Sequence, residues 1–150
     1  MVPISLKAKP RYTMPKGAII SGGARGIGRC LVRRFLERGY HVYVFDIDKE
    51  ELDHTVNSHL KKYSESKALA SSICNLRDVE DIRAKVKQAA DFLGGRIDVL
   101  INNGGIATPQ WGNGKTIEDH DTMAEWQAYV LFNDECSLLL TTSLDMSRRT

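Results

Sequence analysis

Short apolar runs alternate with longer amphipathic stretches along this chain. Four runs have the length of strands buried on both faces of a sheet; they span residues 18–21, 42–45, 68–74 and 97–101. Apolar side chains at helical spacing follow them, over residues 27–38, 50–64, 79–93 and from 122 onward. We therefore expect strands and helices to alternate from residue 17.

The first helical pattern has one apolar face, formed by Ile27, Leu31, Val32, Phe35 and Leu36. The arginines of this segment, including Arg29, are expected to point away from that face. Gly39 ends the helix, because glycine readily adopts the left-handed conformation that closes a helix.

Alternation of strands and helices predicts an α/β fold, a doubly wound parallel sheet with helices on both faces. The expected strand order is 3-2-1-4, with the strand at 97–101 left at an exposed edge. Residues 1–16 carry prolines at positions 3, 10 and 15, and we expect an irregular N-terminal arm there.

A glycine-rich stretch, SGGARGIG at residues 21–28, stands where the first strand turns into the first helix. A sharp turn and a close approach of backbone to a phosphate both require residues without Cβ, and Gly22, Gly26 and Gly28 can fill those positions. The helix start adds N–H groups without helical partners and the positive end of its dipole. The stretch therefore predicts a phosphate-binding loop.

Polar residues follow the other three strands. Asp46, Asn75 and Asn103 each stand where a predicted strand ends. Ligands of open α/β sheets bind outside the carboxyl ends of the strands, so we expect these residues and the glycine loop to line one crevice.

In this order the motifs resemble the short-chain dehydrogenase/reductase family of NAD(P)-dependent oxidoreductases. The family's T-G-x-x-x-G-x-G loop matches residues 21–28, with Ser21 for Thr, and its N-N-A-G stretch matches 102–105, with Gly104 for Ala. We expect the extra glycine to loosen that second loop. The resemblance covers residues 16 to about 144 and implies that 17–150 form an incomplete Rossmann-type dinucleotide-binding domain, with the first four strands and their helices.

The resemblance implies a set of cofactor-binding residues: Ser21, Gly22, Arg25, Gly26, Ile27, Gly28, Asp46, Asn75, Leu76, Asn103 and Gly105. Asp46 can accept hydrogen bonds from the adenosine ribose and would repel a 2′-phosphate, which favours NAD. Arg25 can pair with that phosphate, so NADP stays open. Asn75 stands where the family has an Asp that accepts from the adenine amino group. An N-cap role for Asp46, or for Asp48 in its place, and an ordinary strand-end Asn75 are the alternatives.

Of the family's catalytic set, the helix Asn alone has a counterpart here, Asn133, with a surface Asn at a helix bend as the alternative. The family's Ser and Tyr-x-x-x-Lys normally lie beyond the helix on which these 150 residues stop. The pairs Tyr12–Lys16 and Tyr63–Lys67 have that spacing, but they fall before the first strand and at the end of the second helix. We therefore expect the chain alone to bind NAD(H) weakly and to transfer no hydride to or from an alcohol or ketone.

Two other interpretations stay open. The chain can be a non-catalytic dinucleotide-binding or regulatory partner that pairs with itself or a longer relative through the sheet edge and the last helix. It can also be a truncated product, whose continuing sequence would supply the Ser and the Tyr-x-x-x-Lys.

Composition narrows the classes of partner. The 21 Lys and Arg and 19 Asp and Glu are interleaved, which argues against nucleic acid binding. No apolar stretch approaches the ~20 residues of a membrane-spanning helix. The three cysteines are widely spaced and the four histidines lack metal-ligand spacing, so we expect neither a disulfide framework nor a metal site. With no signal-peptide core in residues 1–16, we expect a cytoplasmic protein.

Overall fold

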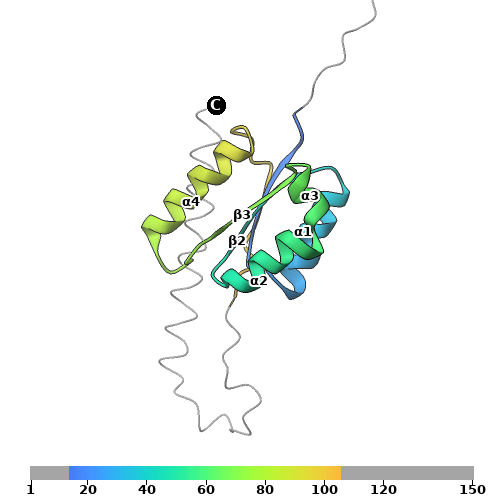
Figure 1. The fold of residues 1–150 in the computed structure, drawn as a ribbon. Helices are drawn as coiled ribbons and strands as arrows, with labels where there is room; N and C mark the ends of the chain where they lie inside the picture. Colours follow the sequence, from blue (N-terminus) through green and yellow to red (C-terminus); the bar gives the residue numbers. More distant parts are fainter. Residues whose placement is uncertain (1–13, 106–150) are drawn as a thin grey trace, which may run out of the picture.

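Four parallel strands form the centre of the molecule in a computed structural model that describes residues 14–105 (Figure 1). They are β1 (Gly17–Ser21), β2 (His41–Asp46), β3 (Leu69–Ile73) and β4 (Val99–Ile101). Their order in the sheet is β3-β2-β1-β4, with all pairs parallel. The predicted fold class and strand order are confirmed.

Helices connect the strands and cover both faces of the sheet. They are α1 (Gly26–Glu37), α2 (Lys49–His54), the π-helical turn η1 (Thr55–His59), α3 (Lys61–Glu65) and α4 (Val79–Phe92). Helices α1, α2 and α3 lie on one side of the strands and α4 lies on the other (Figure 1). Among residues 14–105, no helix has both the length and the apolar character to cross a bilayer.

Alternate strand residues feed two separate cores, because successive side chains of a strand point to opposite faces. Ala18 and Ile20 of β1 pack with Val32 of α1, and Ile19 packs with Ile82 of α4. All five residues of β1 are buried. This burial explains why the strand is a continuous apolar run instead of an alternating one.

The apolar face of α1 is narrower than its sequence pattern predicted. Val32 and Leu36 are buried, but Ile27 is 75% exposed. Ile27 lies in the first turn of the helix, beside the glycine loop and ahead of the part of the helix that packs on the sheet. Its exposed side chain therefore belongs to the rim of the loop.

The prediction of one helix over residues 50–64 is wrong. The segment divides into α2, η1 and α3, and Leu60 adopts φ −123° and ψ 20° at the break. Leu52, Val56 and Leu60 recur every fourth position and are all buried. A regular apolar spacing therefore fits the segment although its hydrogen bonding changes, since the Leu60 N–H donates to the Thr55 carbonyl five residues back.

The third and fourth strands are shorter than predicted, spanning Leu69–Ile73 and Val99–Ile101 instead of 68–74 and 97–101. Residues 1–13 and 106–150 lie outside the described residues. Most of the predicted N-terminal arm, the last helical pattern and Asn133 fall there.

Candidate functional site

The glycine loop turns sharply at the carboxyl end of β1. The Gly22 N–H donates to the Phe45 carbonyl at 2.7 Å, and Gly22 has a φ of +64°. A Cβ added there would stand 2.5 Å from the Cα of Gly104, and one added at Gly28 would overlap the Gly22 carbonyl. Both positions therefore require glycine unless the neighbouring backbone moves.

The loop leads directly into the N-terminus of α1. Arg25 is the N-cap residue in an extended conformation, and its side chain makes no capping hydrogen bond. The first turn contains no acidic residue. The first backbone hydrogen bond of this helix runs from the Arg29 N–H to the Arg25 carbonyl. The N–H groups of residues 26–28 therefore have no acceptor within the helix. An anion would satisfy them and would be favoured by the helix dipole.

Ser21 ties the ends of β1 and β4 together. Its fully buried hydroxyl donates to the Ile101 carbonyl at 3.4 Å and accepts the N–H groups of Asn103 at 3.1 Å and Gly104 at 3.0 Å. The Asn103 side-chain amide donates to the carbonyls of Ser21 and Gly22 at 3.1 and 3.0 Å. Ser21 and Asn103 therefore fix the relative position of the glycine loop and the loop after β4.

Gly104 is closely packed, in contrast to the looser loop that we expected. Its N–H is held by Ser21, and an added Cβ would lie 2.8 Å from the Cδ1 atom of Leu76. The absence of a side chain at Gly104 makes room for the Leu76 side chain, which belongs to the segment after β3.

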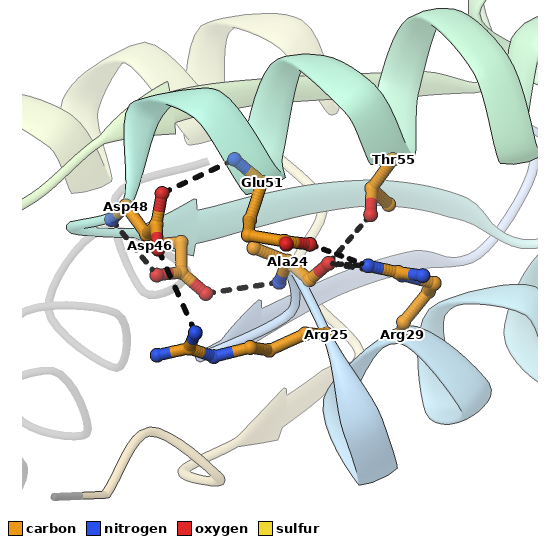
Figure 2. Close-up of polar contacts among 7 residues, drawn as sticks. All are labelled: Ala24, Arg25, Arg29, Asp46, Asp48, Glu51 and Thr55. Atoms are coloured by element: carbon orange, nitrogen blue, oxygen red, sulfur yellow. Dashed lines mark hydrogen bonds and ion pairs between the residues drawn. The ribbon is translucent and has the colours of Figure 1, made fainter.

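Asp46, at the end of β2, holds the glycine loop through hydrogen bonds (Figure 2). One carboxylate oxygen accepts the Ala24 N–H at 2.9 Å and the other accepts the Asp48 N–H at 3.1 Å. Each oxygen retains a lone pair for a ligand hydroxyl. Asp48 is the N-cap of α2, since its side chain accepts the Glu51 N–H at 3.1 Å.

Two arginines lie beside this loop in different environments (Figure 2). The Arg25 side chain is 70% exposed and stands 3.7 Å from the Asp48 carboxylate. Arg29, expected on the outer face of α1, instead turns inward. Its guanidinium donates to the Ala24 carbonyl at 2.9 and 2.7 Å and to Glu51 at 2.8 Å.

Thr55 is a further residue of the site, and no motif in the sequence indicated it. Its fully buried hydroxyl donates to the Ala24 carbonyl at 2.5 Å. The two residues lie 31 positions apart, and no motif spacing relates them.

A hollow of about 90 Å³ opens at the carboxyl ends of β1, β2 and β3. It is lined by Gly22, Asp46, Ile47, Cys74, Asn75, Leu76, Arg77 and Gly105. Five of these were predicted site residues, and Ile47, Cys74 and Arg77 were not. The Asn75 side-chain oxygen accepts the Arg77 N–H at 3.1 Å, so this Asn also shapes its own turn. An apolar hollow with polar groups at its rim suits a flat, nitrogen-rich ring.

Cys74 contributes an apolar wall to the hollow. Burial raises the pKa of its thiol to about 12, with a smaller contribution from the Asp81 carboxylate. The thiol therefore stays protonated at neutral pH. Within residues 14–105, no three His, Cys, Asp or Glu side chains are grouped closely enough to hold a metal ion.

Strand order 3-2-1-4, a glycine loop between β1 and α1 and a carboxylate at the end of β2 define a Rossmann-type fold. The sequence pattern of the short chain dehydrogenase family matches residues 16–145. The chain belongs to that family.

Individual relatives agree with this assignment. The chain is 33% identical over 111 residues to the uncharacterized oxidoreductase YuxG of Bacillus subtilis. The matched region covers 74% of this chain and 15% of that protein. It is 32% identical over 120 residues to the sex determination protein tasselseed-2 of Zea mays, and the matched region covers 75% of this chain and 32% of that protein. A metagenomic short-chain oxidoreductase solved in complex with NADP superposes with a TM-score of 0.69 at 26% identity, covering 87% of this chain and 56% of that one. The chain thus spans less than half the length of these two curated relatives.

Proposed function

We propose that this chain supplies the dinucleotide-binding part of an NAD(P)-dependent oxidoreductase that interconverts an alcohol and a ketone. The observation that carries the proposal is that two features meet at the carboxyl ends of the strands. A helix N-terminus without acidic side chains follows a loop that has no room for a Cβ at Gly22 or Gly28, and an apolar hollow opens beside Asp46. Membership of the short chain dehydrogenase family supports the oxidoreductase class.

Each part of the site suits a different part of a dinucleotide. The N–H groups of residues 26–28 would take the pyrophosphate, because they lack helical acceptors. The hollow bounded by Ile47, Cys74 and Leu76 would take the adenine ring, with Asn75 at its rim. Asp46 would accept the ribose hydroxyls. The bound nicotinamide would supply the hydride chemistry, and the residues above would bind and orient the adenosine half.

We propose NAD as the preferred cofactor. Asp46 and Asp48 would put two carboxylates where a 2′-phosphate would lie, and the exposed Arg25 beside them already faces Asp48. Repulsion between these carboxylates and the negatively charged 2′-phosphate disfavours NADP. NADP binding would require Arg25 to leave Asp48, an exposed pair that is worth about 1 kcal/mol or less.

Fluorescence titration of the 150-residue chain with NADH and with NADPH tests both proposals. We expect saturable binding of both, with NADH about tenfold tighter, and an Asp46→Asn variant that narrows this ratio. Asp53→Asn removes the same charge from the exposed side of α2 and should leave the ratio unchanged. Saturable binding of neither cofactor would overturn the function, and tighter NADPH binding would overturn the preference alone.

For the 150-residue chain by itself we infer cofactor binding without hydride transfer. The inference rests on the resemblance, because the family's Tyr-x-x-x-Lys has no match between Ile101 and Thr150. Cofactor-dependent oxidation of a panel of secondary alcohols by the purified chain would refute it.

Self-association is a second proposal, motivated by β4. In the sheet formed by residues 14–105, β4 pairs with β1 and is the last strand. A parallel edge strand offers backbone donors and acceptors to a further strand, including one from a second copy. We expect a dimer in size-exclusion chromatography, and a monomer at all concentrations would remove this proposal.

A further inference from the structure

The Ala24 carbonyl accepts hydrogen bonds from three donor groups on two helical segments (Figure 2). The Thr55 hydroxyl of η1 lies 2.5 Å away, and two nitrogens of the Arg29 guanidinium lie 2.9 and 2.7 Å away. Thr55 is fully buried, and the Arg29 side chain is only 21% exposed, with its Nη2 also donating to the Glu51 carboxylate. This carbonyl is therefore fixed far more tightly than a loop carbonyl exposed to water.

Fixing the carbonyl also fixes the next N–H. Peptide groups are planar, and residues 14–105 contain no cis bond, so the Arg25 N–H points opposite to the Ala24 carbonyl. On the other side of Ala24, its own N–H is held by Asp46. Both peptide planes that flank Ala24 are thus set by side chains from other segments.

The same contacts strengthen the Arg25 N–H as a donor. Hydrogen bonds to a carbonyl polarise the whole peptide group, and a cationic donor does so most. No acceptor among residues 14–105 takes this N–H, which stands immediately before the first turn of α1. It is therefore positioned to add a fourth donor to those of residues 26–28.

Thr55 lies where the helical hydrogen bonding changes. Thr55 begins η1, and its own carbonyl accepts the Leu60 N–H across five residues. Leu52, Val56 and Leu60 lie in the core, and the Thr55 hydroxyl reaches the glycine loop from the start of this turn. π-helical turns are rare in proteins overall, and those that occur are often found at functional sites.

We propose that Thr55 and Arg29 are positioning residues of the phosphate-binding loop. Through the Ala24 carbonyl they aim the Arg25 N–H at a phosphate of the bound dinucleotide and strengthen that hydrogen bond. The proposal rests on the dinucleotide-binding function given above. It extends the site from the glycine loop to η1, which contacts the loop through the Thr55 hydroxyl.

Binding of ADP and of adenosine to variants of the 150-residue chain tests the proposal, since adenosine lacks the phosphates. Thr55→Val keeps the shape of the side chain and removes the hydroxyl. We expect it to weaken ADP binding about tenfold while adenosine binding stays within about twofold, and we expect Thr55→Ser to restore ADP binding. Ser66→Ala, which removes an exposed hydroxyl bonded to the Tyr63 carbonyl, is the matched control and should change neither.

Amide NMR provides a readout that a general loss of structure would not reproduce. ADP should shift the Arg25 amide proton downfield in the wild-type chain and shift it less in Thr55→Val. If Thr55→Val fails to fold, Arg29→Lys retains the charge but loses the two-nitrogen contact, and we expect it to weaken ADP binding several-fold.

The outcomes separate this proposal from the function on which it rests. ADP binding by Thr55→Val within about twofold of wild type, or by Arg29→Lys if that variant is used, would overturn the positioning role alone. A wild-type chain that binds neither ADP nor NADH would overturn the dinucleotide-binding function as well.

Discussion

Close contacts explain two of the loop glycines better than flexibility does. Gly22 lies against Gly104 and Gly28 lies against the Gly22 carbonyl, so each glycine makes room for backbone atoms. The tight loop that results leaves the N–H groups at the start of α1 open to a ligand. The cost of adding a methyl group at these positions follows directly.

Gly28→Ala should destabilise the fold and abolish cofactor binding. Its Cβ would overlap the Gly22 carbonyl, which is backbone and cannot rotate away, and overpacking of this kind costs about 1–3 kcal/mol. Gly105→Ala is the matched control for stability, because its Cβ would meet nothing closer than the Asn103 carbonyl at 3.8 Å. Urea unfolding measures the free energy of unfolding of both variants. Equal stability of the two variants would contradict the packing described here.

Cysteine reactivity should follow burial. Cys30 is exposed on α1, whereas Cys74 is buried and its pKa is raised to about 12. At pH 8, iodoacetamide should therefore modify Cys30 and leave Cys74 intact in the folded chain, as mass spectrometry of tryptic peptides would show. Rapid modification of Cys74 without unfolding would mean that the hollow is more open than the structure indicates.

Asp98 should make stability depend on pH in the acidic range. A hydrogen bond from the Arg96 guanidinium, aided by the Gly17 N–H, lowers the pKa of this carboxyl below its ordinary value of 3.8. Since the folded-state pKa is the lower one, the stabilisation is complete above the ordinary value and is lost as the pH falls through the lowered one.

Urea unfolding at pH 5.5 and at a series of pH values below 3.8 would measure this effect. Asp98→Asn should be less stable than wild type at the higher pH, and the difference should shrink in acid. Asp53→Asn, an exposed position on α2, serves as the charge-matched control. A difference that stays constant with pH would rule out Asp98 as the titrating group.

The connection from β2 to β3 shows how tertiary contacts override a local pattern. Its apolar spacing predicted one helix, but the buried Thr55 hydroxyl bonds to the glycine loop and a π-helical turn forms there. After α3 the chain turns back toward β3 through Lys67, which has a φ of +59°. A non-glycine residue in that conformation carries a steric cost.

Lys67→Gly should therefore stabilise the protein by up to about 1 kcal/mol, because glycine adopts positive φ without that cost. Lys62→Gly, inside α3, should instead destabilise it by about 1 kcal/mol. Thermal unfolding of the two variants distinguishes the effects. Destabilisation by both would indicate that Lys67 makes a contact more important than its backbone conformation.

At the scale of the whole molecule, the sequence predicted the sheet but not every residue of the site. Four apolar runs separated by helical patterns predict a parallel sheet, and the glycine loop indicates its first crossover. The positions of Asp46 and Asn75 at strand ends follow from that topology. The roles of Arg29 and Thr55 do not, since they depend on a contact between segments that no sequence period relates.

The central claim is that the carboxyl edge of this sheet binds a dinucleotide through its adenosine diphosphate half. A titration of the ¹⁵N-labelled 150-residue chain with NAD⁺, followed by two-dimensional amide NMR, tests it most directly. We predict saturable shifts confined to the glycine loop and the strand-end hollow, at Gly22, Arg25, Gly26, Ile27, Gly28, Asp46, Asn75, Leu76, Asn103 and Gly105. Absence of saturable shifts, or shifts centred on the opposite edge near Gly17 and Asp98, would contradict the claim.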